Sequence, residues 1–476
     1  MARANTYRER WLMKRRLMTV IPARRILRLA PVLVLCAVAG RPAGAQTLVD
    51  ALATAYTTNP TLRAARADLR VVNEGVPQAL SNWRPEVTVS AELGRQRSER
   101  DLESSSSTDN TTPNRAELQV RQFLYRGGRT IADVKASEDD VRAQRALLLS
   151  TEQGVLLNAA TAYWDVWRDQ AIVELNFNNE RVIARQLEAT QDRFTVGEVT
   201  RTDVAQAETR LADATAQRVS SEGDLTASRA VFEQIVGGPP TDLEPPFDLG
   251  GLPATLDEVV QLAITSNPDV VSAVFAEKAQ QSRIRETTGE LLPTLQVTGS
   301  ASRAEDTISE DTLTEQLQVL AELTVPLYQQ GSVTSRVREA KQFASRLRIQ
   351  VEEVRRREEQ EAISAWQALE TARANILSFE SGVRSAEIAL EGVQQENLVG
   401  ARTILDILDA EQELLDAQVS LVGSQRDEIV AGFQVLTAIG RMTAKDLTLP
   451  VEVYEPEADY LKVRNRWFGL EAPGTE

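Results

Sequence analysis

The sequence of 476 residues contains no histidine, and its single cysteine is Cys36. The absence of histidine excludes a histidine-containing catalytic triad, a histidine zinc site and most general acid–base schemes. Aromatic residues make up 5% of the chain and charged residues 26%. This composition is typical of long helices that pack along narrow apolar seams, not of a globule with a thick core. We therefore expect no enzyme activity, no cofactor and no metal site.

Residues 1–45 are predicted to be a secretory signal peptide. They carry ten Lys and Arg against one acidic residue, then an apolar run over 29–39 and a small-residue cleavage site over 43–45. The run is too short to cross a bilayer, which needs about 20 apolar residues. We expect cleavage to release Gln46. The leader is long as written, and a start at Met18 would give one of more usual length, so both starts stay open.

Cleavage would make the chain more acidic and would remove Cys36. It leaves 43 Lys and Arg against 68 Asp and Glu, a formal net charge of −25. Such a charge argues against nucleic acid as a partner. The mature chain also has no continuous apolar run of 18 or more residues, so we expect no membrane-spanning helix. If the chain enters a membrane, strands must form the span.

The mature sequence repeats itself once. Asn59-Pro60 corresponds to Asn267-Pro268, 208 residues on, whereas positions after the first strand pair correspond at a spacing of 203. A unit of about 190 residues is a duplicated domain-sized element and not a short solenoid repeat. We predict a first repeat over 46–237, a Pro/Gly-rich linker over 238–254, a second repeat over 255–440, and a tail over 441–476 that packs near the linker.

Two stretches without proline, 114–238 and 327–449, predict long helices. Both are rich in Ala, Leu, Glu, Gln and Arg, which favour helix. Each stretch should hold one very long helix, a break and a shorter helix, with the breaks at Gly197 and Gly400, where a threonine follows to cap the next helix. A helix over 130–195 would be roughly 100 Å long. Narrow apolar stripes containing small residues favour antiparallel coiled-coil packing.

Each repeat also contains two segments in which apolar and polar residues alternate. Val87, Val89, Ala91 and Leu93 illustrate the pattern, and similar segments occur near 118–124, 295–301 and 317–325. These predict four strands of about nine to eleven residues, the length that crosses a bilayer. The polar segments between them, 97–114 and 303–314, are predicted to be exposed loops.

Four strands cannot close a membrane barrel, because the smallest such barrels use about eight. Subunits must therefore share a barrel if the strands enter lipid. The alternative is a soluble four-stranded cap that packs on the helices. Tyr125 and Tyr328 lie where strands would leave the membrane, and both an aromatic girdle and simple packing would account for them.

The order of helix, strand hairpin, very long helix, break and helix resembles the TolC family of outer-membrane channels over residues 46–440. The most specific pieces are QFLYRGGRT, VPLYQQGS and GARTILDILDAEQELLDAQ, and the tail LPVEVYEPEADYLKVRNRWFGL resembles the type I secretion branch. The resemblance implies a mainly α fold with a small β part. It implies a homotrimer whose coiled-coil helices form an α-helical barrel through the periplasm, while four strands per subunit build a shared 12-stranded transmembrane β-barrel.

The same resemblance implies a location and partners. The channel would lie in the outer membrane of a Gram-negative bacterium, in contact with outer-membrane lipid, and would extend into the periplasm. A periplasmic adaptor and an inner-membrane transporter, either ABC-type or proton-driven, would dock at its far end. The expected function is a passive exit duct of a tripartite efflux or type I secretion system. A periplasmic adaptor and a structural coiled-coil spacer remain the alternatives, and the cargo stays open.

Within the family, acidic residues near the second break close the periplasmic tip. The resemblance assigns the pore constriction to Asp406 and Asp409. It assigns the gate links to Arg402 and its first-half partners Thr202 and Asp203. Asn397 departs from the family, because some members have a tyrosine there that helps to hold the gate shut. Closure in this chain would then depend on fewer links.

The residues themselves leave two interpretations open. Thr403-x-x-Asp406 and Thr200-x-x-Asp203 have the spacing of capping boxes, in which the aspartate serves helix stability alone. Asp409 corresponds to Gln206 in the first repeat, so the shared fold does not require its charge. Three copies of two such acids would gather six carboxylates, which would raise some of their pKa values and attract cations.

Overall fold

A computed structural model describes residues 47–476 apart from 103–104, 242, 246–249, 308–310 and 473–476. The predicted signal peptide, residues 1–45, lies outside the described residues, and so does part of the predicted linker.

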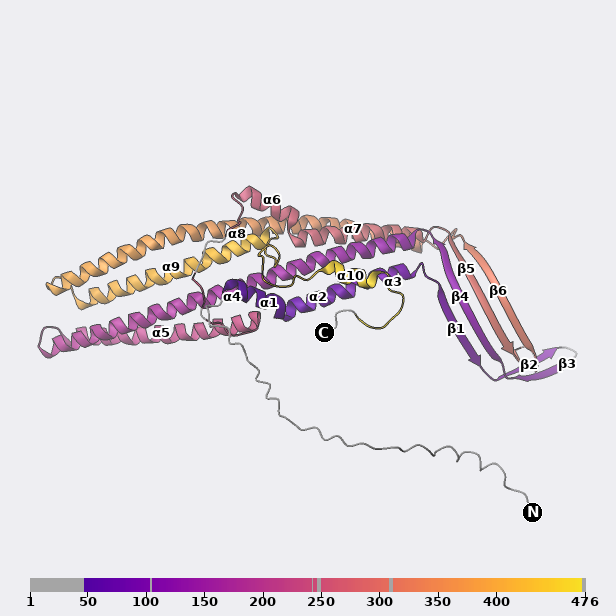
Figure 1. Ribbon diagram of the computed structural model, residues 1–476, viewed down its shortest axis with the longest axis horizontal. Helices are drawn as coiled ribbons and strands as arrows, with labels where there is room; N and C mark the ends of the chain where they lie inside the picture. Colours follow the sequence, from indigo (N-terminus) through magenta and orange to yellow (C-terminus); the bar gives the residue numbers. More distant parts are fainter. Residues whose placement is uncertain (1–46, 103–104, 242, 246–249, 308–310, 473–476) are drawn as a thin grey trace, which may run out of the picture. The chain divides into compact units, whose positions relative to one another are not determined.

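Ten helices account for most of the described chain (Figure 1). The first-half helices are α1 (Leu48–Thr58), α2 (Pro60–Asn73), α3 (Gly75–Ser81), α4 (Arg129–Thr195) and α5 (Arg201–Val236). The others are α6 (Leu256–Ser266), α7 (Pro268–Gly289), α8 (Ser332–Leu398), α9 (Ile404–Ala438) and α10 (Pro456–Arg464). The two very long helices and the breaks after them are confirmed. Helices α4 and α8 have 67 residues each, which gives each a length of roughly 100 Å.

Four strands form one antiparallel sheet in the order β1-β4-β5-β6. They are β1 (Glu86–Leu93), β4 (Asn114–Arg126), β5 (Thr294–Glu305) and β6 (Leu313–Thr324). Their lengths of 8, 13, 12 and 12 residues depart on both sides from the expected nine to eleven. The three longer strands exceed the expected length because backbone pairing continues where the alternation of side chains fades, as in β4, which has a register shift between Phe123 and Tyr125.

The prediction of a loop over 97–114 was wrong. In that segment β2 (Gln96–Leu102) pairs antiparallel with β3 (Ser105–Thr111), from Gln96 opposite Thr111 to Leu102 opposite Ser105. Polarity indicates that a segment is unsuited to lipid, but it says nothing about backbone pairing. Serine and threonine fit an exposed two-stranded ribbon as well as they fit a loop, and threonine favours strand.

The expectation that no helix could span a membrane needs correction. Residues Leu256–Gly289 are long and apolar enough to qualify, with a mean hydropathy of 1.3 over an 18-residue window. Counting continuous apolar runs missed this stretch, because polar residues interrupt it. In the structure Asn267 and Pro268 divide it into α6 and α7, which pack against α8 and α4.

The main core lies where the helices of both halves meet. Trp164, Tyr163, Phe232, Tyr56 and Phe433 are among its largest fully buried side chains. Helix α4 packs against α5, α7 and α9, and α8 packs against α7 and α9. The tail adds Met442, Ala444 and Leu449 to the same core, and α10 packs against α2 and α3.

Helix ends meet end to end at two equivalent junctions in this core. Asn267 caps α7 and donates through Nδ2 to the carbonyl of Ala438 at 3.1 Å, at the end of α9. Asn59 caps α2 and donates in the same way to the carbonyl of Ile235 at 3.0 Å, near the end of α5. The asparagine of each repeat therefore satisfies one helix start and one helix end together.

Gly440 permits this close approach. Its φ of 80° lies in the left-handed region, and a Cβ atom there would lie 2.8 Å from the carbonyl oxygen of Ser266. We predict that Gly440→Ala destabilises the protein by about 1–3 kcal/mol, because both the backbone and the contact become strained. Thermal unfolding in detergent measures this. Gly392→Ala is the control, since a Cβ there meets nothing within 4 Å. Equal midpoints for the two variants would contradict the role of Gly440.

The second junction alone carries a buried acid. Glu358 on α8 is 3% exposed and accepts from Nδ2 of Asn267 at 2.8 Å and from Arg357 at 3.1 Å. Burial raises the pKa of its carboxyl group, and the charge of Glu361 adds to that shift. Val155 stands at the corresponding position of the first repeat.

The raised pKa of Glu358 makes stability depend on pH. Above the ordinary value of 4.5, the folded state holds this proton longer than the unfolded state does, so stability falls as pH rises through the folded pKa. We predict that Glu358→Gln raises the unfolding temperature, relative to that of the unmodified protein, and that this rise is larger at about pH 8 than at about pH 5. Thermal scans measure the difference, with exposed Glu359→Gln as the control. Parallel pH profiles for Glu358→Gln and the unmodified chain would contradict it.

Candidate functional site

The two helix breaks have the same backbone geometry. At the first, the amides of Gly197 and Glu198 donate to the carbonyls of Phe194 and Arg193 at 3.0 and 2.9 Å. At the second, Gly400 and Ala401 donate to the carbonyls of Asn397 and Glu396 at 3.0 and 2.9 Å. Both glycines have positive φ, so each long helix ends in a left-handed turn that satisfies its last carbonyls.

Asp406 closes a complete capping box at the start of α9. Its Oδ2 accepts from the amide of Thr403 at 2.8 Å and from the Thr403 hydroxyl at 2.7 Å, and the Asp406 amide donates to Thr403 Oγ1 at 3.3 Å. The hydrogen bonds from the side chain and backbone of Thr403, and then the charge of Arg402, lower the pKa of Asp406. Asp203 and Thr200 form the same box at α5. Both aspartates therefore have the hydrogen bonds of a capping box within one chain.

Arg402 is held by acids of its own break. Its Nε lies 2.8 Å from Glu396 Oε2 at the end of α8, and its Nη1 lies 3.8 Å from Asp406 Oδ1. In the described part of a single chain, its ion pairs do not include Asp203, and its hydrogen bonds do not include Thr202. The structure thus brings Arg402 together with Asp406, but not with the first-half residues.

Asn397 ties the second break to the first half. Its Nδ2 donates to the carbonyl of Arg402 at 2.9 Å, and its Oδ1 accepts from Nη1 of Arg193 on α4 at 3.3 Å. A short amide therefore makes two bonds at the position where some family members have a tyrosine. The sequence indicated only the departure and gave no sign of the Arg193 contact.

Asp409 forms an ion pair with Arg210 of α5. Both side chains are partly exposed, Arg210 at 37% and Asp409 at 55%. This link between the halves was missed, because it joins positions that do not correspond in the repeat: Arg210 aligns with Glu413, and Asp409 aligns with Gln206. A signal was available in the sequence: when the repeats are aligned, the acidic Asp409 falls one helical turn before the basic Arg210.

A small apolar cluster lies beside this ion pair. Ile404 and Leu408 of α9 pack with Ile183 of α4 and with Ala207 and Ala214 of α5. The first turns of α9 therefore contact both first-half helices. The two helix pairs of one chain are held together near the breaks by this cluster, the Arg210–Asp409 pair and the Arg193–Asn397 bond.

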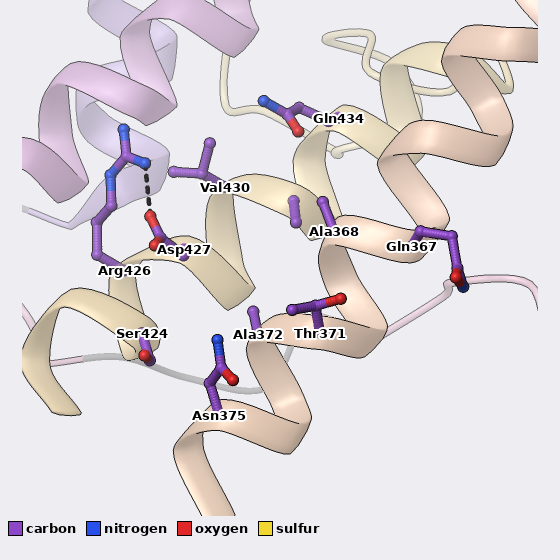
Figure 2. A pocket seen from close by; sticks show the side chains of 11 residues that line it. Gln367, Ala368, Thr371, Ala372, Asn375, Ser424, Arg426, Asp427, Val430 and Gln434 are labelled. Carbon is purple, nitrogen blue, oxygen red and sulfur yellow. Dashed lines mark hydrogen bonds and ion pairs between the residues drawn. The ribbon is translucent and has the colours of Figure 1, made fainter. Parts of the chain in front are cut away.

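Equivalent grooves follow the two helix pairs further from the breaks. One, of about 450 Å³, runs between α8 and α9, and the other, of about 470 Å³, runs between α4 and α5. Figure 2 shows Arg426 and Asp427 joined on α9, with Asn375 and Thr371 on the α8 side. Arg426 also reaches Asp165 of α4 at 2.9 Å. Because Arg426 aligns with Gly223, this link too joins the halves through a residue that the repeat does not share.

Comparison with known proteins places the chain among outer-membrane channels. The family described as outer membrane efflux protein matches residues 51–238 and 259–441. The outer membrane efflux protein BepC of Brucella suis is 35% identical over 436 residues, covering 91% of this chain and 94% of that protein. The outer membrane protein TolC of Escherichia coli is 25% identical over 423 residues, covering 85% and 84%. The solved CmeC outer membrane channel of Campylobacter jejuni shares the fold, with a TM-score of 0.75 at 16% identity over 88% of this chain and 89% of the other.

The Arg210–Asp409 pair gives a prediction for the tip. We expect a coupling of about 0.2–1 kcal/mol that shrinks with added salt, because both groups are partly exposed. Hydrogen exchange at the first turns of α5 and α9, measured for Arg210→Gln, Asp409→Asn and the double variant, yields this coupling. Additive effects of the two substitutions at low salt would show that the pair does not hold the halves together.

Proposed function

The chain belongs to the outer membrane efflux protein family, and from that premise we propose that three copies assemble into one gated duct. The protein is an outer-membrane exit duct for efflux and type I secretion, and it extends into the periplasm. Family and fold are those of passive channels, so the adaptor and spacer alternatives fall away. The number of subunits, the gate and the partners are the proposed parts.

The open sheet supports assembly most directly. Among the described residues, β1 and β6 form its two edges, with no further strand beyond either. Val87 and Val89 on one edge and Leu317 and Val319 on the other are exposed. Unpaired backbone groups are costly in lipid, so these edges must pair with strands of other copies. Three copies would supply 12 strands, enough to close a barrel.

Partners at the periplasmic end are supported by two features. The sequence contains no phosphate-binding loop of the form GxxxxGK[ST], the motif with which many transport ATPases bind ATP. Val196 and Val399, one at each break, are exposed together with Leu398. We propose that these tips dock a periplasmic adaptor, and that an inner-membrane transporter drives export through the assembled duct.

We propose that Asp406 and Asp409 form the constriction. The two acids are three residues apart on one helix, so they share a face. Three copies would bring six carboxylates around one axis, where Arg402 and Arg210 already hold one acid each within a subunit. Opening would require these links to rearrange. Thr202 and Asp203 would meet Arg402 only from another copy, and Asn397 would hold Arg402 through its carbonyl.

Replacement of both Asp406 and Asp409 by Ala tests the gate. We expect a several-fold higher conductance of the trimer in planar bilayers and a weaker response to divalent cations, because the carboxylate ring is removed. Glu387→Ala with Glu391→Ala removes the same charge from exposed positions of α8 and serves as the control. Unchanged conductance and unchanged cation response in the Asp406/Asp409 variant would rule out these acids as the constriction.

A further inference from the structure

The segment that follows α10 exposes a cluster of large apolar side chains. Phe468 is 85% exposed and Trp467 58% exposed, and Leu470 is fully exposed. The rings of Trp467 and Phe468 lie 6.4 Å apart. Neither the capping, the helix seams nor the proposed gate gives these residues a role. Exposed aromatic groups in a cluster usually mark an interaction surface.

The backbone of this segment is folded so that it needs few outside partners. Arg466 donates through Nε to the carbonyl of Phe468 at 3.1 Å and through Nη1 to the carbonyl of Glu471 at 2.6 Å. Gly469, with a φ of 113°, permits the reversal around this guanidinium. We call residues Trp467–Leu470 the aromatic loop. Arg466, the residue just before the loop, satisfies the carbonyl of Phe468, while the side chains of Phe468 and Leu470 are almost wholly exposed.

The aromatic loop is fixed beside the root of β1. Arg84, two residues before that strand, donates through Nη1 to the carbonyl of Arg466 at 2.8 Å, and its guanidinium lies 4.8 Å from the centre of the Trp467 ring. The neighbouring Trp83 is itself 55% exposed, and its carbonyl accepts from Gln122 of β4 at 3.1 Å. Figure 1 shows the chain after α10 passing beneath α3 near the start of β1.

We propose that the aromatic loop inserts into the boundary between headgroups and acyl chains in the periplasmic leaflet of the outer membrane. The loop lies beside the start of β1, where the helices give way to the strands. Trp83 and Trp467 are amphipathic rings of the kind that gathers at this depth. Arg84 and Arg466 place two guanidinium groups at the same level, where they complement lipid phosphates.

The two edges of the sheet differ in which part of the chain supplies their exposed apolar groups. At the β6 edge, Leu327 and Tyr328 follow the strand directly and are strongly exposed. At the β1 edge, Trp83 is the corresponding exposed group before the strand, and the tail, which lies outside the repeat, adds Trp467 and Phe468. The two edges of one subunit therefore both present large apolar groups at the interface, one from the repeat and one largely from the tail.

Site-directed spin labelling of the full chain tests this insertion. Residues 46–476 contain no cysteine, so Phe468→Cys gives a single labelled site in the processed chain, and Lys462→Cys, at an exposed position of α10, is the matched control. In phospholipid nanodiscs, we expect the ratio of oxygen accessibility to nickel-chelate accessibility to be several-fold higher at 468 than at 462. In detergent-free vesicles of mixed phosphatidylethanolamine and phosphatidylglycerol the same order should hold.

Either of two spin-label results would overturn the proposal. Equal ratios at 468 and 462 would show a loop in water. Low accessibility to both reagents at 468, unchanged between detergent and lipid, would show a contact with another subunit or within the chain. If Phe468→Cys fails to assemble, quenching by brominated phospholipids compares the unmodified protein with Trp467→Phe. We expect Trp467→Phe to lose a strongly quenched component, and an unchanged quenched fraction would also contradict insertion.

Discussion

A four-stranded sheet that meets lipid cannot satisfy its own edges, and most features of this structure follow from that constraint. Backbone groups of β1 and β6 need partners that one chain does not provide. When several copies close a barrel, their sheets lie around one axis. The junctions between strands and helices must then all lie at the same height along that axis. The duplicated sequence achieves this, because each repeat has the same order of elements. Helix α3 leads into β1 and β4 leads into α4, and in the second repeat α7 leads into β5 and β6 leads into α8. Length in the periplasm is then supplied by α4 and α8.

The two repeats share what builds the wall and differ where they contact each other. Both have a capping box after the break, a glycine in the left-handed region and an asparagine that joins two helix ends. The links between halves use residues without an equivalent. Arg426 aligns with Gly223, Asp409 with Gln206, and Arg210 with an acid. These links between the halves therefore depend on positions at which the two repeats differ in sequence.

Much of the fold could be predicted from local sequence signals. The proline-free spans gave the long helices, and Gly197 and Gly400 with their threonines gave the breaks, since these effects act within one or two helical turns. The β2–β3 ribbon could not be predicted, because polarity does not determine pairing. For the candidate site, the capping of Asp406 followed from its spacing to Thr403. The partners of Asp409 and Asn397 did not, because they depend on which helices lie side by side, and side-chain spacing along one helix carries no such information.

The distribution of buried groups along the helices decides where the halves can separate. In the main core, large apolar side chains of both halves pack together, among them Trp164 of α4 and Phe433 of α9, and each large apolar side chain of this kind contributes about 1.5–3 kcal/mol on burial. Near the breaks the halves are joined by a cluster of smaller side chains and by Arg210–Asp409, a partly exposed pair of the class that contributes about 0–1 kcal/mol. Separation at the tip therefore costs far less than separation at the core. The proposed opening of the periplasmic end would therefore leave the helix junctions at Asn59 and Asn267 intact.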